Sequence, residues 1–204
     1  MEDSKYIYGN KLFWINKRIF DIILSLLLLP LLFTTGIILL FFNLFFNQGK
    51  LFFIQKRMGK NCDYFFVIKF RTMINVKEIT RKYDDPIETN RITLLGKFLR
   101  KMRIDELPQI LNVLMGDMSL IGPRPDYYVH ALEYLENVEG YRERYTIRPG
   151  ISGLSQIRLG YVDTLEATSK KAFIDNYYIQ NVGYIIELKI ILNTIFIIIK
   201  GMGK

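Results

Sequence analysis

Apolar residues fill one long segment near the start of the chain. Between Ile22 and Gly49 no residue is charged, and Leu, Ile and Phe predominate. About 20 apolar residues are enough for a helix to cross the hydrocarbon core of a bilayer. The pattern therefore predicts a membrane element in this part of the chain.

Basic residues flank this segment on both sides. Lys and Arg collect in the cytoplasmic flanks of membrane segments, so a simple span would carry one basic group to the opposite side. A helical hairpin that enters the membrane and returns to the same face keeps both groups on one side, and we favour this re-entrant arrangement. The basic residues are Lys5, Lys11, Lys17 and Arg18 before the segment and Lys50, Lys56, Arg57, Lys60 and Lys69 after it.

Pro30 lies inside the apolar segment and is the expected membrane break. A proline within a helix removes one backbone hydrogen bond and clashes with the preceding turn. We therefore expect two helical legs, Ile22 to Leu29 and Leu31 to Phe46. A single kinked transmembrane helix is the alternative, because membrane helices tolerate proline. A cleaved signal peptide is disfavoured, because the segment lies deep in the chain and lacks a small-residue cleavage site.

The remainder of the chain predicts an α+β fold that is mostly helical. Alternating β-branched and aromatic residues indicate a small β-hairpin, and apolar residues at helical spacing indicate helices. We expect two parts, residues 1–49 with the membrane hairpin and residues 50–204 forming a domain. The expected elements are strands over 51–55 and 64–70, a polar loop over 75–90, and helices over 94–102, 108–115, 127–145 and 165–181.

The last helical stretch, residues 184–200, has one apolar face and one partly polar face. An amphipathic helix lying in the membrane interface fits this pattern. A core helix and a second span are the alternatives, because some isoleucines also lie on the polar side. The apolar face holds Leu188, Leu192, Ile195 and Ile199; the opposite face holds Lys189, Asn193 and Lys200, with Ile186, Ile190 and Ile197 among them.

Positive charge is concentrated next to the apolar segment. The formal net charge is +8, and residues 50–104 hold 14 of the 28 Lys and Arg against five acids. Such a surface attracts polyanions or anionic lipid headgroups. Nucleic acid is the competing partner, and the apolar membrane segment argues against it.

Single copies of two residue types exclude several kinds of site. Cys62 is the one cysteine and His130 the one histidine, which excludes an internal disulfide, a Cys-rich zinc site and a histidine cluster. A metal here would be held by carboxylates and substrate phosphates, which indicates Mg²⁺. Neither GxxxxGK nor GxGxxG occurs, so the common nucleotide-binding motifs are absent.

Two adjacent carboxylates, Asp105 and Glu106, precede a predicted helix and follow three basic residues. Carboxylates at this position ordinarily cap a helix and complement its dipole. The same surroundings favour the ionised form of a carboxylate, and an ionised Asp can attack phosphorus. The pair is therefore a candidate for both capping and nucleophilic chemistry.

Several cations could bind phosphate around this pair. Lys69 and Arg71 are two residues apart in a predicted strand, so we expect both on one face. Arg124 is held between two prolines, and Arg148 precedes a Pro-Gly pair. Arg is suited to forked contact with phosphate oxygens. Together these residues indicate diphosphate chemistry.

In order, these segments resemble the bacterial sugar transferases, specifically the monotopic (small) phosphoglycosyl transferases acting on polyprenol phosphate. The resemblance covers most of residues 17–160 and continues more loosely to about residue 200. The matching stretches are KRIFDIILS, GKLFFIQKRMGKN, FFVIKFRTM, ITLLGKFLRKMRIDELPQILNVLMGDMSLIGPRPD and RPGISGLSQ.

The resemblance implies a two-step reaction at the cytoplasmic face of the bacterial inner membrane. Asp105 matches the carboxylate that attacks a UDP-sugar bound with Mg²⁺, with Asp105 also near the metal, and releases UMP. Polyprenol (undecaprenyl) phosphate then takes the phosphosugar from Asp105, which starts glycan assembly. Glu106 matches the assisting carboxylate. The matching substrate-binding cations are Lys69, Arg100, Arg124 and, in the RPG segment, Arg148.

The chain departs from the family pattern in two places. The usual Ser-Pro pair, expected near Phe33, is absent, so the depth and angle of the hairpin are open. The usual ITGWAQVNGR becomes ISGLSQIRLG over residues 151–160, which leaves the sugar unassigned.

Two other classes of function stay open beside this one. The first is a catalytically idle adaptor of the same fold that recruits glycosyltransferases at the membrane. The second is a single-span basic protein that binds anionic membrane lipids. The resemblance also allows downstream glycosyltransferases and a second copy of the chain as partners.

Overall fold

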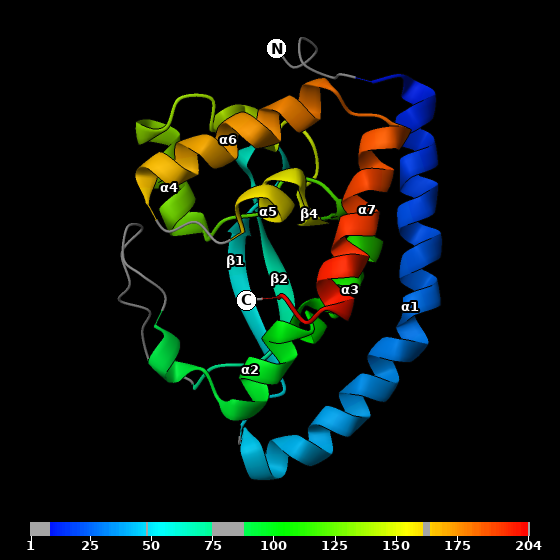
Figure 1. Ribbon diagram of the computed structural model, residues 1–204, viewed down its shortest axis with the longest axis vertical. Coiled ribbons are helices and arrows are strands. Elements are labelled where there is room, and N and C mark those ends of the chain that lie inside the picture. Colours follow the sequence, from blue (N-terminus) through cyan, green and yellow to red (C-terminus); the bar gives the residue numbers. More distant parts are fainter. Residues whose placement is uncertain (1–8, 48, 75–87, 161–163, 204) are drawn as a thin grey trace.

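The computed structural model describes residues 9–47, 49–74, 88–160 and 164–203. Helices predominate in these ranges, with two small sheets (Figure 1). The strands are β1 (Phe52–Met58), β2 (Tyr64–Phe70), β3 (Ser119–Ile121) and β4 (Gly150–Ser152). The α-helices are α1 (Lys11–Phe46), α2 (Leu94–Lys101), α3 (Gln109–Met115), α4 (Tyr128–Asn137), α5 (Leu154–Leu159), α6 (Leu165–Gln180) and α7 (Tyr184–Ile199), and the short 3-10 turns include η3 (Ile104–Glu106) and η4 (Arg142–Tyr145).

Helix α1 confirms the long apolar element and changes its expected form. It begins at Lys11, ahead of the apolar run, where the Asn10 side chain accepts a hydrogen bond from the Leu12 amide. The helix continues through Pro30, and Figure 1 shows it bent rather than interrupted. The Thr34 hydroxyl donates to the Pro30 carbonyl at 3.0 Å, which adds a hydrogen bond beside the position where proline supplies none. The expected helix–break–helix is therefore a bend.

One side of α1 packs against the rest of the protein. The buried side of the first leg is polar: Lys17 forms a 2.6 Å ion pair with Glu187 on α7, and Asp21 accepts from the Ser119 hydroxyl at 2.7 Å. The buried side of the second leg is apolar, where Leu32 and Leu39 join a core cluster. The other buried members of that cluster are Phe70 on β2, Leu99 on α2 and Ile110 on α3.

The other side of α1 leaves large apolar residues exposed. In its most apolar stretch 17 % of the residues are buried. Among the described residues it is also the one helix long and apolar enough to cross a membrane. A core helix would be mostly buried, so membrane association is indicated. Re-entry into a bilayer stays a prediction.

The predicted β-hairpin is confirmed. Strands β1 and β2 pair antiparallel from Phe52 opposite Phe70 to Met58 opposite Tyr64. Strand β1 runs three residues further than expected, and the turn uses Asn61 in the left-handed region at φ 58°. The hairpin places Lys69 at its far end, one residue before β2 ends.

A second pairing, between β3 and β4, was not predicted. The two strands run parallel, with Ser119 opposite Gly150 and Ile121 opposite Ser152. Strands β3 and β4 both lie in parts of the chain for which no element was expected. The backbones near β3 and β4 lie so close together that a Cβ built on Gly150 would be 2.1 Å from the Gly122 nitrogen. Glycine is required where two backbones approach in this way.

Helix α7 has two apolar faces. Ile190 is fully buried against the core, while Leu188, Leu192 and Ile199 are more than half exposed. One face therefore packs in the core, and the position of the exposed face in the membrane interface stays a prediction. At 16 residues α7 is shorter than the span of about 20 that a bilayer requires. Figure 1 shows it beside the first leg of α1.

The other predicted elements are confirmed with one correction. Helices α3 and α6 lie where expected, and α3 ends at Gly116 with φ 97°. The single helix expected over 127–145 is wrong: α4 ends at Asn137, and η4 follows Gly140, whose φ is 71°. Most of the expected loop at 75–90, residues 75–87, lies outside the described residues.

Candidate active site

Asp105 and Glu106 occupy the short turn η3 between α2 and α3. Arg103, just before the turn, adopts left-handed backbone angles (φ 58°) and ends the preceding helix. The two carboxylates are buried, with 7 % and 6 % of each residue exposed. Helix α3 then begins at Gln109, so the predicted position of the pair before a helix is confirmed.

Glu106 is held by three cations from three elements. The Lys69 ammonium on β2 lies 3.0 Å from one carboxylate oxygen, and Arg103 lies 3.3 Å from the other. Arg124 approaches both oxygens, with one nitrogen at 3.2 Å and the second in close contact. Burial alone would raise the pKa of Glu106, but Arg124 and Lys69 outweigh it and hold this pKa well below its usual range.

Asp105 has a different environment. In the described part of the chain its carboxylate accepts no hydrogen bond and forms no ion pair within 4.0 Å. Burial and the neighbouring Glu106 raise its pKa, while Lys69, Arg100 and Arg124 act in the opposite direction. A buried carboxylate without hydrogen-bond donors is poorly solvated. Glu106 is therefore fixed by its partners, whereas the Asp105 carboxylate has none among the described residues.

Lys69 is a cation that can lose its proton near neutral pH. Burial lowers the pKa of Lys69 to about 8, from an ordinary value of 10.5. The charge of Glu106 raises it, and the nearby Arg124 lowers it further. The positive charge that Lys69 contributes to the site is thus sensitive to mildly alkaline pH.

Arg100 reaches the site from α2. Its Nε donates to the Thr72 hydroxyl at 2.9 Å, and its charge acts on Asp105. The close packing of α2 on the residues after β2 depends on Gly96, because a Cβ there would lie 2.1 Å from the Thr72 carbonyl oxygen. The glycine lets α2 approach until Arg100 faces the carboxylate.

A buried ionic network positions the loop that carries Arg124. Arg144, fully buried, donates to the Arg124 carbonyl at 3.0 Å. Its other nitrogens bind Asp126 at 2.8 Å and Asp175 at 2.9 Å. Lys171 also contacts Asp126. Burial would raise the pKa of Asp126, but Lys171 and Arg144 lower it strongly, so this carboxylate stays ionised.

Asn112 fixes α3 to β2 and so sets the distance between Glu106 and Lys69. Its buried side chain accepts from the Ile68 amide at 3.0 Å and donates to the Phe66 carbonyl at 2.8 Å. These two bonds occupy the edge of β2 in the way that a neighbouring strand would. Lys69 follows directly in the same strand.

The expected pair of cations on one strand face does not form. Strand β2 ends at Phe70, and the buried Arg71 turns toward the C-terminal end of α1. There it donates to the Lys50 carbonyl at 2.7 Å and contacts the Asn47 carbonyl, while Asn47 donates back to the Arg71 carbonyl. A cation at a helix C-terminus satisfies unpaired carbonyls. Arg71 therefore has structural partners beyond the end of α1 and does not contact Glu106, and substrate binding by Arg71 stays a prediction.

Arg148 also lies apart from the cations that hold Glu106. It is exposed and donates to the Gly116 carbonyl at 2.8 Å, at the end of α3. Phosphate binding by Arg148 stays a prediction. Of the site residues expected from sequence, the structure brings together Asp105, Glu106, Lys69, Arg100 and Arg124.

The amino-acid sequence was compared with models of known protein families. The family model described as bacterial sugar transferase matches residues 12–201. The chain belongs to the bacterial sugar transferase family. The match extends from α1 through α7, so the bent helix, the carboxylate pair and the cations that hold it all lie within the family domain.

Three relatives show what such proteins do elsewhere. A UDP-N-acetylgalactosamine-undecaprenyl-phosphate N-acetylgalactosaminephosphotransferase of Aeromonas hydrophila is 36% identical over 92% of this chain and 44% of its own length. A UDP-glucose:undecaprenyl-phosphate glucose-1-phosphate transferase of Escherichia coli (strain K12) is 36% identical over 93% and 42%. An exopolysaccharide production protein of Rhizobium leguminosarum bv. phaseoli is 36% identical over 88% and 92%. The chain thus spans less than half the length of the first two.

Sequence reasoning missed the residues that support the site. Arg103 could have been found, because it lies three residues before Glu106 next to a turn. Asn112, Arg144 and Asp126 had no such indication, because their partners are far away in sequence. Only the fold shows these contacts.

Proposed function

We propose that this protein transfers a sugar-1-phosphate from a UDP-sugar to undecaprenyl phosphate and so starts the assembly of a glycan. Family membership supports the proposal, as do relatives whose names specify transfer from UDP-sugars to undecaprenyl phosphate. The observation that carries it is the unequal environment of the two adjacent carboxylates. One is held by three cations, and none of the described residues donates a hydrogen bond to the other.

In the first step a carboxylate oxygen of Asp105 attacks the β-phosphorus of the UDP-sugar. A bond forms between this oxygen and phosphorus, and the bond from phosphorus to the bridging oxygen breaks. The bridging oxygen leaves with UMP, and the sugar phosphate stays on Asp105. Lys69, Arg100 and Arg124 lie where they can stabilise the negative charge on the phosphate oxygens.

In the second step an oxygen of undecaprenyl phosphate attacks the same phosphorus. The bond between phosphorus and Asp105 breaks, which frees the carboxylate and gives undecaprenyl diphosphate-sugar. Covalent catalysis divides one difficult transfer between two bulky phosphates into two displacements at one carboxylate. Glu106, held on both oxygens, keeps the surrounding cations in place throughout.

Magnesium fits this site only as a partner of the substrate. In the described residues no three His, Cys, Asp or Glu side chains gather to hold a metal ion. Mg²⁺ is usually bound by one or two carboxylates together with substrate phosphates and water. Asp105 would supply one such ligand, and the ion would neutralise charge on the diphosphate.

We further propose that the catalytic pair works at the cytoplasmic face of the bacterial inner membrane, with α1 re-entrant and the protein monotopic. The basic flanks of the apolar segment and the bend at Pro30 support this arrangement. The second leg of α1 packs with Leu99 and Ile110, on the two helices that enclose η3. The site therefore lies close to the membrane element, where a soluble nucleotide can meet a lipid phosphate.

Replacement of the nucleophile tests the proposal. The full-length protein in detergent micelles with Mg²⁺ is mixed with a panel of UDP-sugars. Intact-mass spectrometry should detect an added sugar phosphate, and UMP should be released. Asp105→Asn should abolish both, whereas Asp63→Asn, which removes an exposed carboxylate, should change neither.

The outcomes separate the competing functions. UMP release by Asp105→Asn at the unaltered rate would reject Asp105 as the nucleophile. A wild-type protein that releases no UMP with any UDP-sugar would instead support the idle adaptor. Loss of transfer to undecaprenyl phosphate with the adduct retained would assign a defect to the second step.

A further inference from the structure

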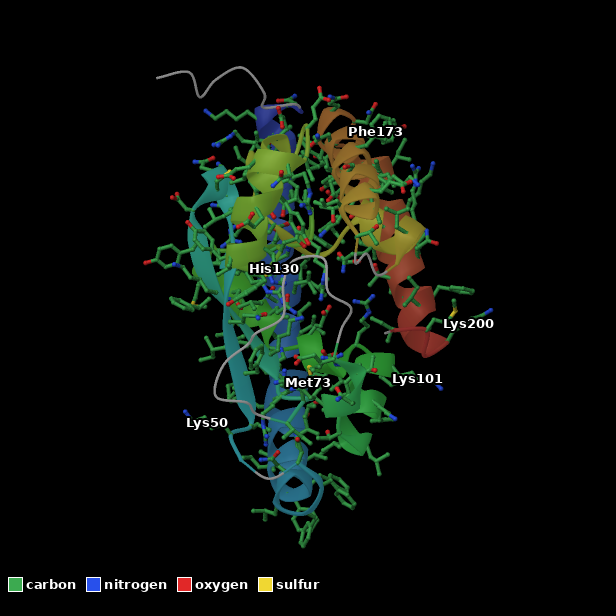
Figure 2. All side chains as sticks on the ribbon, turned by 90° about the vertical axis from the view of Figure 1, so that its left-hand side faces the viewer. Lys50, Met73, Lys101, His130, Phe173 and Lys200 are labelled. Carbon is green, nitrogen blue, oxygen red and sulfur yellow. The ribbon has the colours of Figure 1, made fainter. Side chains whose placement is uncertain are left out.

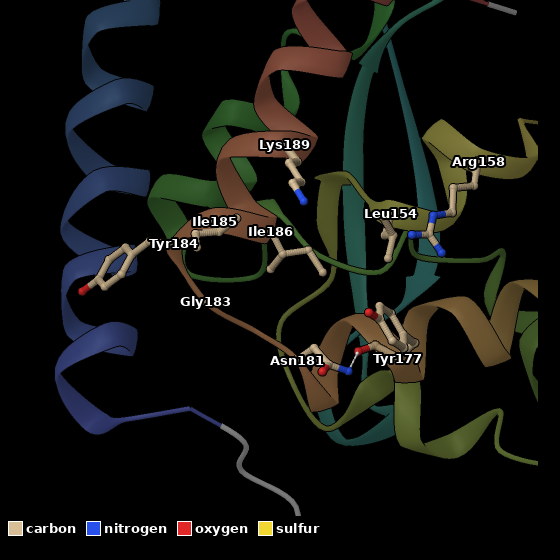
Figure 3. Close-up of a pocket in the computed structure, with 9 residues that line it drawn as sticks. All are labelled: Leu154, Arg158, Tyr177, Asn181, Gly183, Tyr184, Ile185, Ile186 and Lys189. Carbon is tan, nitrogen blue, oxygen red and sulfur yellow. Dashed lines mark hydrogen bonds between the residues drawn. The ribbon is translucent and has the colours of Figure 1, made fainter.

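A cavity of about 480 Å³ opens between α5, α6 and α7. None of the residues around Glu106 lines it. Its walls are largely apolar and aromatic, with Leu154, Tyr177, Tyr184 and Ile186 among the lining residues (Figure 3). The reaction proposed above uses none of these residues. An accessible apolar cavity of this size is a place where a ligand can bind.

Two cations face this cavity from different helices. Arg158 comes from α5 and Lys189 from α7, and Figure 3 shows both side chains directed into the space between the helices. In the described part of the chain neither forms a salt bridge, and the Arg158 guanidinium lies 5.8 Å from the centre of the Tyr177 ring. Positive charge beside an apolar wall matches an anionic amphiphile, which has a charged head and an apolar chain.

The cavity lies at the boundary between the polar and apolar faces of α7. Lys189 and Asn193 are exposed on its polar strip, one turn apart. Ile185, which also lines the cavity, begins the exposed apolar face that continues through Leu188 and Leu192. A helix in the membrane interface places this boundary at the level of the lipid headgroups.

Helix α1 brings a second membrane-facing surface to the edge of the cavity. The Tyr184 hydroxyl accepts a hydrogen bond from Asn16 at 2.9 Å. On the same helix Leu12, Ile15 and Ile19 leave about half of their surface exposed. The apolar surfaces of α1 and α7 therefore meet beside the two cations.

We propose that this cavity binds one anionic phospholipid of the surrounding bilayer. The phosphate lies between Arg158 and Lys189, and an acyl chain follows Leu154 and Ile186. The inference rests on the proposed membrane placement of α7 but not on the transfer reaction.

Quenching of the one tryptophan tests this directly. Trp14 packs against the same core cluster as Ile186. The full-length protein is reconstituted into phosphatidylcholine vesicles that contain a fraction of either brominated phosphatidylglycerol or brominated phosphatidylcholine. Brominated phosphatidylglycerol should quench Trp14 more strongly, because it concentrates in the cavity.

The variants are chosen to keep the fold. Arg158 and Lys189 are exposed, and substitutions at such positions change stability little. Arg158→Gln and Lys189→Gln should each lower the preference for phosphatidylglycerol about fivefold, and Lys189→Arg should keep it. The control is Lys60→Gln with Arg142→Gln, which removes two exposed charges elsewhere.

Every outcome has a defined meaning. An unchanged preference in the Arg158→Gln, Lys189→Gln double variant would overturn the proposal, as would an equal loss in the control. In lipid-free micelles, a raised KM for the UDP-sugar or for undecaprenyl phosphate in the double variant would assign the cavity to that substrate instead. Absence of transferase activity with the preference intact would count against the proposed function and leave the lipid site standing.

Discussion

Asp105 and Glu106 are neighbours of equal charge whose carboxylates lie in different surroundings. Lys69, Arg103 and Arg124 all contact Glu106. Their combined field favours ionisation of Glu106. At Asp105 burial and the neighbouring Glu106 raise the pKa, while Lys69, Arg100 and Arg124 oppose this rise. A buried carboxylate that receives no hydrogen bond from the described residues is poorly solvated, and this is the carboxylate that we propose attacks the phosphate.

Two buried or half-buried arginines provide a matched test of function against structure. Arg124→Ala should lower kcat at least tenfold, because the arginine faces the reacting carboxylates, and should change Tm little. Arg71→Ala should leave two carbonyls at the end of α1 without donors and lower Tm by roughly 5–10 °C. Thermal unfolding and UMP release measured on both variants distinguish the two. The reverse pattern would contradict the assignment of Arg71 as structural.

The pKa of Lys69 predicts how substrate binding depends on pH. Its pKa of about 8 lies below the ordinary 10.5, so the ammonium is charged below pH 8 and becomes neutral above it. The KM for the UDP-sugar should therefore rise as the pH increases beyond about 8. Lys69→Arg, which stays protonated, should remove this rise even if kcat falls. A profile that is unchanged in the variant would show that another group titrates.

For single residues, the sequence predicted which side chains belong to the site better than it predicted where those side chains lie. Asp105, Glu106, Lys69 and Arg124 came from charge, spacing and family resemblance, and the structure brings them together. Arg71 was misplaced because strand alternation was extended one residue beyond the end of β2. Asn112 and Arg144 could not be found, because a buried polar side chain has no distinct pattern when its partners come from remote segments.

Among the elements, the contact between β3 and β4 controls where Arg124 lies. The Gly122 amide donates to the Ser152 carbonyl at 2.9 Å, and the Gly150 amide donates to the Pro123 carbonyl at 2.9 Å. Arg124 follows directly. The loop is therefore set by backbone pairing on one side and by Arg144 on the other.

Adding one methyl group at this contact should misplace the arginine. A Cβ on Gly122 would lie 2.8 Å from the Arg148 carbonyl oxygen, so the backbone must shift. Gly122→Ala should lower kcat by about a hundredfold, the effect expected of a displacement near 1 Å. Gly36→Ala, where nothing lies within 4 Å of the added Cβ, is the control. Steady-state UMP release checks both, and equal activity would contradict the positioning role.

Element prediction failed for one long helix, expected over 127–145 and ending at Asn137, and for the two shortest strands. The β-hairpin, α3 and α6 followed from apolar spacing and turn residues. Strands β3 and β4 have three residues each and pair across a long sequence separation. No local pattern reveals such a pair. The second apolar face of α7 was visible in its isoleucines, but only the fold shows that one face packs inward.

For the whole molecule, the bent α1 combines two kinds of surface. Its inner side docks through Lys17, Asp21 and Leu32, and its outer side presents exposed Leu, Ile and Phe. Figure 2 shows Lys101 and Lys200 near the ends of α2 and α7. The Gly203 amide, just after α7, donates to the Lys101 carbonyl at the end of α2 at 3.0 Å. Three helices with exposed apolar residues are thus joined into one unit.

The proposed membrane topology can be measured. In a Cys62→Ser background, Lys11→Cys and Lys60→Cys lie on either side of the apolar segment. A re-entrant α1 at the cytoplasmic face leaves both cysteines inaccessible to an impermeant maleimide in spheroplasts and accessible after lysis. Labelling of one position before lysis would show a single span and defeat the re-entrant proposal.

The ion pair between Lys17 and Glu187 bears on how the chain is made. The two residues are 170 positions apart, so α1 leaves the ribosome long before its buried partner exists. Asp21 has no partner until β3 is synthesised and Lys17 none until α7 is synthesised, and hydrocarbon would offer them none. We expect the nascent α1 to stay in the headgroup layer during translation. It packs against the folded domain after translation ends.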